Sequence, residues 1–227
     1  ICVAPHLVKF LPSHTMVKTG GEEGIHAVAA APYGSVGMLP VTYGYLLMLG
    51  AEGLKHVTEM AILNANYLAS SFEKLGFKIL FKGSKGRVGH EMIWDCNMFN
   101  KEYGISELDI AKRLMDFGFH APTLSFPVHG TLMVEPTESE PNEELDRFIE
   151  ALKTIREEMI EVGEGKADKT DNVLKNAPHT HKVLTADEWS HAYPRSKAAY
   201  PLAWVAENKF WPQVGRVDDG YGDRNLM

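Results

Sequence analysis

The strongest constraint on the fold is an amphipathic helical pattern over residues 51–75 that leads directly into two strand-like runs. Apolar residues recur there at three- and four-residue spacing with charged residues between them: Leu54, Val57, Ala61, Ile62, Ala65, Leu68, Ala69, Phe72 and Leu75. Beyond Gly76, the runs FKILF (77–81) and HEMIWDC (90–96) flank the turn-forming segment KGSKGRVG. These runs are predicted to be neighbouring antiparallel strands.

Two more helices and one more strand follow. Ser106 is predicted to cap a helix that ends at Gly118, and TLMVEP (131–136) is predicted to be a strand. The helix after Pro141 has apolar residues at helical spacing up to the glycines at 163 and 165. The order helix, strand, strand, helix, strand, helix predicts an α+β fold, an antiparallel sheet with helices packed on one face.

Residues 166–227 follow a different pattern. They are rich in Pro, His, Asn, Trp and Tyr and hold neither helical nor strand periodicity for long. We expect an extended, irregular tail whose aromatic residues pack on the rest of the protein.

Composition excludes several classes of protein. The net charge is −7, and no Lys/Arg-rich block is present, which argues against a nucleic-acid-binding surface. The longest apolar run, around residues 38–49, is too short to span a bilayer. Two widely spaced cysteines suit a reducing compartment. The opening ICVAPHLVKFLP, with neither an initiator methionine nor a signal pattern, is expected to be the middle of a longer sequence.

The segment 118–140 holds the densest set of polar residues in an apolar context. Prolines fix the backbone around His120, Thr123, His129 and Glu135, so these side chains either face a ligand or serve as caps and turn hydrogen bonds. Lys18 lies beside glycines but also beside acidic residues, so we expect it to be solvated and not catalytic.

Histidine pairs offer weak metal-binding patterns. His90 and Glu91 are adjacent at a strand start, where they would point to opposite faces and could not share a metal. His179 and His181 in PHTHK could share one side of an extended chain, but they have no nearby Cys or carboxylate ligands. No metal site is predicted.

The segment APYGSVGMLP (31–40) runs from a glycine turn into an apolar stretch. Glycine turns before a helix can hold a phosphate through backbone N–H groups and the helix dipole, although many only begin a helix. The segment alone leaves both interpretations open.

Taken together, several motifs resemble the C-terminal part of glycine decarboxylase, the pyridoxal-phosphate subunit of the glycine cleavage system. They are FLPSH, APYGSVGMLP, GLKHVTEMAILNANYLA, GHEMIWD, AKRLMDFGFHAPTLSFPVHGTLMVEPTESE, ELDRF and ENKFWPQVGRVDDGYGD. The resemblance covers essentially the whole chain, and residues 111–140 are its most specific part.

This resemblance implies the small C-terminal domain of an aspartate-aminotransferase-like (fold type I) enzyme. Residues 1–50 would be a remnant and linker of the large cofactor domain, with an interface loop and a buried helix. Residues 51–165 would form the small α+β domain, and residues 166–227 a wrapping tail. The implied reaction decarboxylates glycine through pyridoxal phosphate and passes the aminomethyl group to the lipoyl arm of a carrier protein.

The resemblance also implies where the site residues lie. The Schiff-base lysine would lie upstream of Ile1, so the chain alone would be inactive. Gly34 and Ser35 would bind the cofactor phosphate across a homodimer or two-half interface, and His120 and Thr123 would line the substrate or carrier channel. The segment TLMVEPTE lacks the arginine that many aminotransferases use to bind the substrate carboxylate. The alternative function is a non-catalytic docking module or a split subunit.

Overall fold

The helical pattern at 51–75 forms the second half of α1 (Leu39–Lys74) in the computed structural model, which describes residues 2–226. The helix is interrupted at Gly50, which has φ 60° and ψ −172°. Glycine adopts a positive φ at little cost because it carries no Cβ. The chain divides into two units, Ile1–Lys55 and His56–Met227, and α1 contributes to both.

The first unit is formed by loops, two short 3-10 helices, η1 (Pro5–Phe10) and η2 (Val36–Met38), and the beginning of α1. No residue from 2 to 55 is buried. Large apolar side chains along the helix are open to solvent, among them Leu39, Val41, Leu47 and Met48, the last with 87% of its surface exposed.

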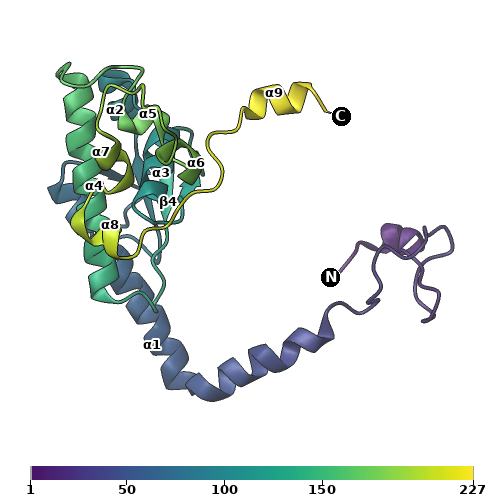
Figure 1. Ribbon diagram of the computed structural model, residues 1–227. Helices are drawn as coiled ribbons and strands as arrows, with labels where there is room; N and C mark the ends of the chain where they lie inside the picture. Colours follow the sequence, from purple (N-terminus) through teal and green to yellow (C-terminus); the bar gives the residue numbers. More distant parts are fainter. Residues whose placement is uncertain (1, 227) are drawn as a thin grey trace. The chain divides into compact units, whose positions relative to one another are not determined.

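The second unit is built on a four-stranded antiparallel sheet in the order β1 (Lys78–Leu80), β2 (Met92–Asp95), β4 (Thr131–Val134), β3 (Thr123–Leu124). Trp94 pairs with Leu132, and Met92 pairs with Val134. All four of these side chains belong to the main core cluster, whereas the alternate pair Ile93 and Met133 does not. The helices therefore pack on one face of the sheet, and the predicted α+β fold class is confirmed (Figure 1).

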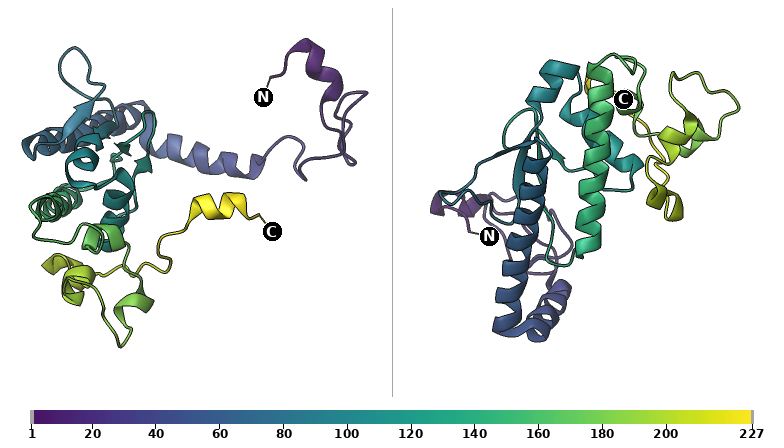
Figure 2. Two further views of the ribbon diagram at one scale, coloured as in Figure 1. Left: turned by 90° about the horizontal axis from the view of Figure 1, so that it is seen from above. Right: turned by 90° about the vertical axis from the view of Figure 1, so that its left-hand side faces the viewer.

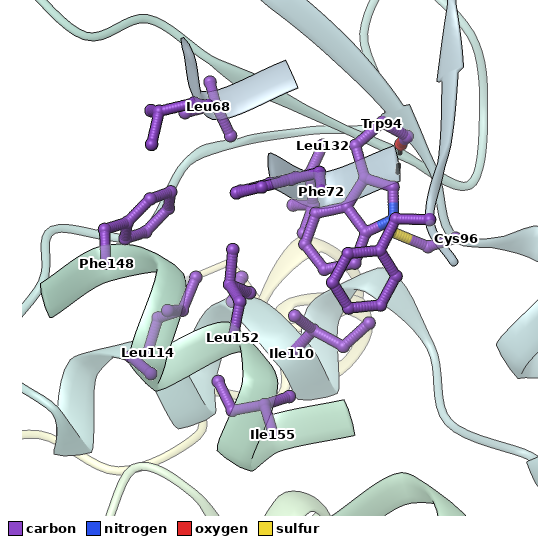
Figure 3. Packing of buried hydrophobic residues seen from close by; sticks show 14 of the residues in the cluster. Leu68, Phe72, Trp94, Cys96, Ile110, Leu114, Leu132, Phe148, Leu152 and Ile155 are labelled. Carbon is purple, nitrogen blue, oxygen red and sulfur yellow. Dashed lines mark hydrogen bonds between the residues drawn. The ribbon is translucent and has the colours of Figure 1, made fainter. Parts of the chain in front are cut away.

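Three helices cover that face: the second half of α1, α3 (Glu107–Asp116) and α4 (Asn142–Gly163). In Figure 3 their labelled side chains converge on Phe72 and Trp94, whose rings lie 5.6 Å apart edge to face. Phe148 of α4 lies 5.9 Å from Phe72. Apolar burial of this kind supplies most of the stability of a domain.

Local signals set the helix ends. Ser106 caps α3 as predicted, and it forms a capping box with Asp109. The short helix α2 (Asn97–Tyr103) was not predicted from the sequence, because its residues are mostly polar and Phe99 alone is buried within it. His90 and Glu91 precede β2 instead of lying in it, so strand alternation does not separate them as expected.

Over residues 166–226 the tail contains five short helices: α5 (Val173–Asn176), α6 (His181–Leu184), α7 (Arg195–Ala199), α8 (Ala203–Glu207) and α9 (Asp219–Arg224). Aromatic residues attach it to the domain, as expected. Trp204 donates a hydrogen bond to Glu150 at 2.7 Å and stacks under Arg147. Within residues 2–226, no helix has the length and apolar character needed to cross a membrane.

Candidate functional site

A groove of about 460 Å³ opens between the 118–123 loop, the end of β4 and the start of α4. Its apolar side is formed by Leu68 of α1 with Leu145 and Phe148 of α4. His120 and Thr123 line it from the loop, and Thr123 is held there because it pairs with Met133 in the sheet.

Carboxylates also line this groove. Glu135 follows β4, Glu140 lies in the connecting loop, and Glu144 lies in the first turn of α4. Asn64 of α1 donates a hydrogen bond to the carbonyl of Thr137 at 2.9 Å, which fixes this loop. No lysine or arginine is among the described residues that line the groove. The groove thus suits a neutral or cationic ligand better than a carboxylate or phosphate.

The structure brings together three of the four polar residues singled out in the sequence of this region. His120, Thr123 and Glu135 share the groove, whereas His129 instead approaches the Ser125 hydroxyl at 3.3 Å. Ser125 also donates a hydrogen bond to Glu107 at 2.8 Å. His129 therefore makes a contact within its own loop. Of the two alternatives left open by the sequence, a ligand-facing side chain or a turn hydrogen bond, it follows the second.

At the end of α3, two residues before Gly118 of the groove lining, Asp116 is the centre of a buried polar network. It accepts hydrogen bonds from the backbone N–H and the Nδ1 of His179, both at 2.7 Å. The other ring nitrogen of His179 lies 2.8 Å from the Tyr193 hydroxyl. Burial alone would raise the pKa of Asp116, but the His179 hydrogen bond and the Arg113 charge outweigh it and lower that pKa.

Arg113 joins this network to α4 and to the tail. Its guanidinium, fully buried, binds both carboxylate oxygens of Glu158 at 2.7 and 3.0 Å and Asp116 at 3.0 Å. It also donates to the carbonyls of Lys197 and Ala198. Burial would lower the Arg113 pKa, yet the Glu158 charge raises it, so the buried guanidinium stays charged.

Lys209 fixes the last turn of α3 from the tail. Its Nζ donates to the carbonyl of Asp116 at 2.5 Å, two residues before the groove-lining loop begins. Burial lowers the pKa of Lys209 to about 8. The tail thereby helps to position the loop that carries His120 and Thr123.

The second tail contact involves Asp109 of α3. Its carboxylate accepts hydrogen bonds from Lys175 and from Arg216, both at 2.7 Å. Burial would raise the pKa of Asp109, but these cationic donors and the Ser106 backbone lower it. The tail is thus held by two groups of ionic contacts as well as by its aromatic residues.

Gly34 and Ser35 lie in the first unit, in an exposed turn just before η2 and α1. Gly34 has φ 84°, with open space where a Cβ would stand, and its N–H donates to Ala31 at 3.1 Å. The Ser35 side chain makes no capping hydrogen bond. Lys18, in the same unit, is exposed.

Metal-ligating side chains do not cluster within residues 2–226. No group of three or more His, Cys, Asp or Glu side chains in this range could hold an ion. The possibility of a metal shared by His179 and His181 does not fit the structure, because both ring nitrogens of His179 are engaged by Asp116 and Tyr193.

Sequence reasoning missed several residues of the site. Glu140 and Glu144 come from the next helix and its loop, and no local motif marks them. Arg113 and Asp116 were not singled out either, although two charged residues on the apolar side of a predicted helix are themselves an indication of buried pairing.

Comparison with known proteins shows to which family this chain is similar. Residues 57–179 match the model of the family described as glycine dehydrogenase, C-terminal domain. The glycine dehydrogenase (decarboxylating) of Flavobacterium johnsoniae is 60% identical over all 227 residues, and that of Bacteroides fragilis is 57% identical over the same length. The protein of the same name from Bdellovibrio bacteriovorus is 54% identical. The chain spans 23–24% of the length of these relatives.

Proposed function

The chain belongs to the glycine dehydrogenase C-terminal domain family, and from this we propose that it works as part of an enzyme that decarboxylates glycine. The observation that carries the proposal is the similarity to glycine dehydrogenases (decarboxylating) along the entire chain, including the tail. In the proposed reaction, the aminomethyl group passes to the lipoyl arm of a carrier protein. We assign the Schiff-base role to no residue of this chain and expect the chain alone to be inactive.

Pyridoxal phosphate is the proposed cofactor, and it would act as the electron sink when glycine loses CO2. Gly34 and Ser35 fit its phosphate: the glycine leaves open space at its Cα, and the serine hydroxyl is free of a capping bond at the start of a helical segment. We propose that the Ser35 hydroxyl donates to the cofactor phosphate of a partner subunit in a homodimer, and that Gly34, whose N–H already donates to Ala31, lets the phosphate come close to the backbone.

The groove is proposed as the channel for the carrier arm. A lipoyl-lysine arm is long, apolar and neutral, which agrees with the Leu68, Leu145 and Phe148 side of the groove. The substrate carboxylate would need a cationic partner, and the described lining residues include none. We therefore assign His120 and Thr123 to the carrier arm and leave glycine to other parts of the enzyme.

The first unit is proposed to belong to the large cofactor domain. A helix that is apolar on all sides is stable when it is covered, and the beginning of α1 exposes Leu39, Val41, Leu47 and Met48. We propose that the rest of the enzyme covers this surface. The divisions at residues 50 and 165 inferred from the sequence stay predictions.

Two substitutions in the full-length holoenzyme test the proposal. Ser35→Ala removes a donor to a charged phosphate, so pyridoxal phosphate should dissociate about tenfold more readily on dialysis, as measured by its absorbance. Ser84→Ala, in an exposed loop, is the matched control. Equal cofactor retention in both variants would remove Gly34 and Ser35 from the cofactor site.

His120→Leu tests the groove. Transfer to the lipoyl carrier should show a higher KM for the carrier, while the KM for glycine stays unchanged. A raised KM for glycine alone would instead assign the groove to the substrate. Exchange of glycine with bicarbonate by the 227-residue chain alone would refute the expected inactivity, whereas carrier binding without any activity in the full-length protein would favour the docking module.

A further inference from the structure

A further pocket at the end of α1 is lined by residues of α1, α4 and the turn after α1. The two helices run next to each other in Figure 2. The pocket has a volume of about 260 Å³ and is lined by Lys74, Leu75, Gly76, Lys153, Arg156 and Glu157. This is small for an organic cofactor but adequate for a small ion. All of its lining residues belong to the second unit.

The pocket is cationic, although the protein as a whole is acidic. Three positive side chains and one negative side chain surround it, in a chain of net charge −7. Within residues 2–226, Lys74, Lys153 and Arg156 form no ion pair, and Glu157 does not neutralise them. Three close and unneutralised cations repel one another, and an anion between them would remove that cost.

Arg156 supplies the most specific observation. Its Nε is buried and has no hydrogen-bond partner. A buried, unpaired donor is costly and indicates that a water molecule or an ion completes the site. A Cβ placed on Gly76 would lie 3.6 Å from Nη2 of Arg156 and 3.9 Å from its Nε. These two nitrogens form the edge of the guanidinium that binds an oxyanion through two hydrogen bonds, and this edge faces a residue that has no side chain.

We propose that this pocket binds a small tetrahedral oxyanion of the phosphate type. Arg156 would donate from Nε and Nη2, and the flexible ammonium groups of Lys74 and Lys153 would bind the remaining oxygens. The backbone amides at the end of α1 take no part, because Leu75, Gly76 and Phe77 already donate to the last carbonyls of the helix. Neither Gly34 nor Ser35, the residues assigned to the cofactor, lines this pocket.

The test is a calorimetric titration of the chain with inorganic phosphate at constant ionic strength. We expect one saturable site that Arg156→Gln weakens at least tenfold, since a charged hydrogen bond is lost. Lys153→Gln should weaken it less, because an exposed lysine contributes one mobile charge. Lys182→Gln, the same charge change at an exposed site in α6, should leave the isotherm unchanged.

Three outcomes would overturn the proposal. Unaltered phosphate binding by Arg156→Gln, with weaker binding by Ser35→Ala, would place the phosphate in the first unit. Equal effects of chloride would show simple screening of charge. Acetate binding as tightly as phosphate would refute the preference for a tetrahedral anion. Circular dichroism of Arg156→Gln, expected to match the unsubstituted chain, establishes that lost binding is not lost folding.

Discussion

Replacing Arg113 by methionine should lower the free energy of unfolding by about 3–5 kcal/mol at pH 7. Methionine can occupy much of the same space as arginine, so the change removes charge and hydrogen bonds more than volume. What it leaves behind is the cause of the loss: the carboxylates of Glu158 and Asp116 stay buried without their cation.

The magnitude follows from the contacts of the guanidinium. It makes three bonds to carboxylate oxygens, at 2.7, 3.0 and 3.0 Å, and two to tail carbonyls. Removing one partner of a buried ion pair lowers the free energy of unfolding far more than an exposed ion pair raises it, because the remaining charge stays buried without compensation. The ion pair of the exposed Lys78 with the half-buried Asp95 is the control, and Lys78→Met should cost less than about 1 kcal/mol.

The loss should also depend on pH. The folded-state pKa of Asp116 is lowered, so its contribution is present above the unfolded value of about 3.9 and is lost as the pH falls through the folded value. Without Arg113 that pKa rises and the contribution shrinks. The difference in the free energy of unfolding between the unsubstituted chain and Arg113→Met should therefore be largest near pH 7 and smaller at pH 3.5.

Urea unfolding at both pH values, followed by tryptophan fluorescence, measures these differences. Adding Glu158→Gln to Arg113→Met should restore part of the stability, because one unpaired charge is removed. A loss below about 1 kcal/mol at pH 7, or a loss that does not change on acidification, would refute the reasoning.

Two further substitutions test other parts of the fold. Ser106→Ala removes the cap and half of the capping box of α3 and should cost about 1 kcal/mol in the same unfolding assay, whereas Ser106→Thr should keep most of it. Lys209 has a folded-state pKa of about 8, below its unfolded value of about 10.4, so stability due to this group should rise between pH 8 and pH 10. Lys209→Met should abolish that rise, and an unchanged pH profile would show that the amine is not desolvated.

The elements predicted correctly from the sequence are those with local causes. The helix at 51–75, the strands around the glycine turn and the Ser106 cap depend on spacing or on a single residue. Strand β3 is two residues long and α2 is mostly polar, so neither leaves a periodic pattern. The interruption of α1 at Gly50 was likewise not predicted, because Gly50 follows directly on an apolar run.

In the candidate site, too, only the residues with a local sequence signal were predicted. His120 and Thr123 lie three residues apart, so a single motif marks both, and they do line one groove. Asp116 and His179 are 63 residues apart, and the pairing of a helix end with a tail histidine has no local signal. The sequence therefore left the partners of His179 unidentified, where the structure has a buried hydrogen bond to Asp116.

The distance along the chain between Arg113 and its carbonyl partner at Ala198, 85 residues, matters during synthesis. At about 5–20 residues per second, a ribosome needs about 4–17 s to make that interval. During this time the nascent α3 holds a guanidinium whose tail acceptors do not yet exist. Folding of this domain is thus coupled to late translation, and a pause downstream of α4 would prolong the state in which chaperones meet an incomplete core.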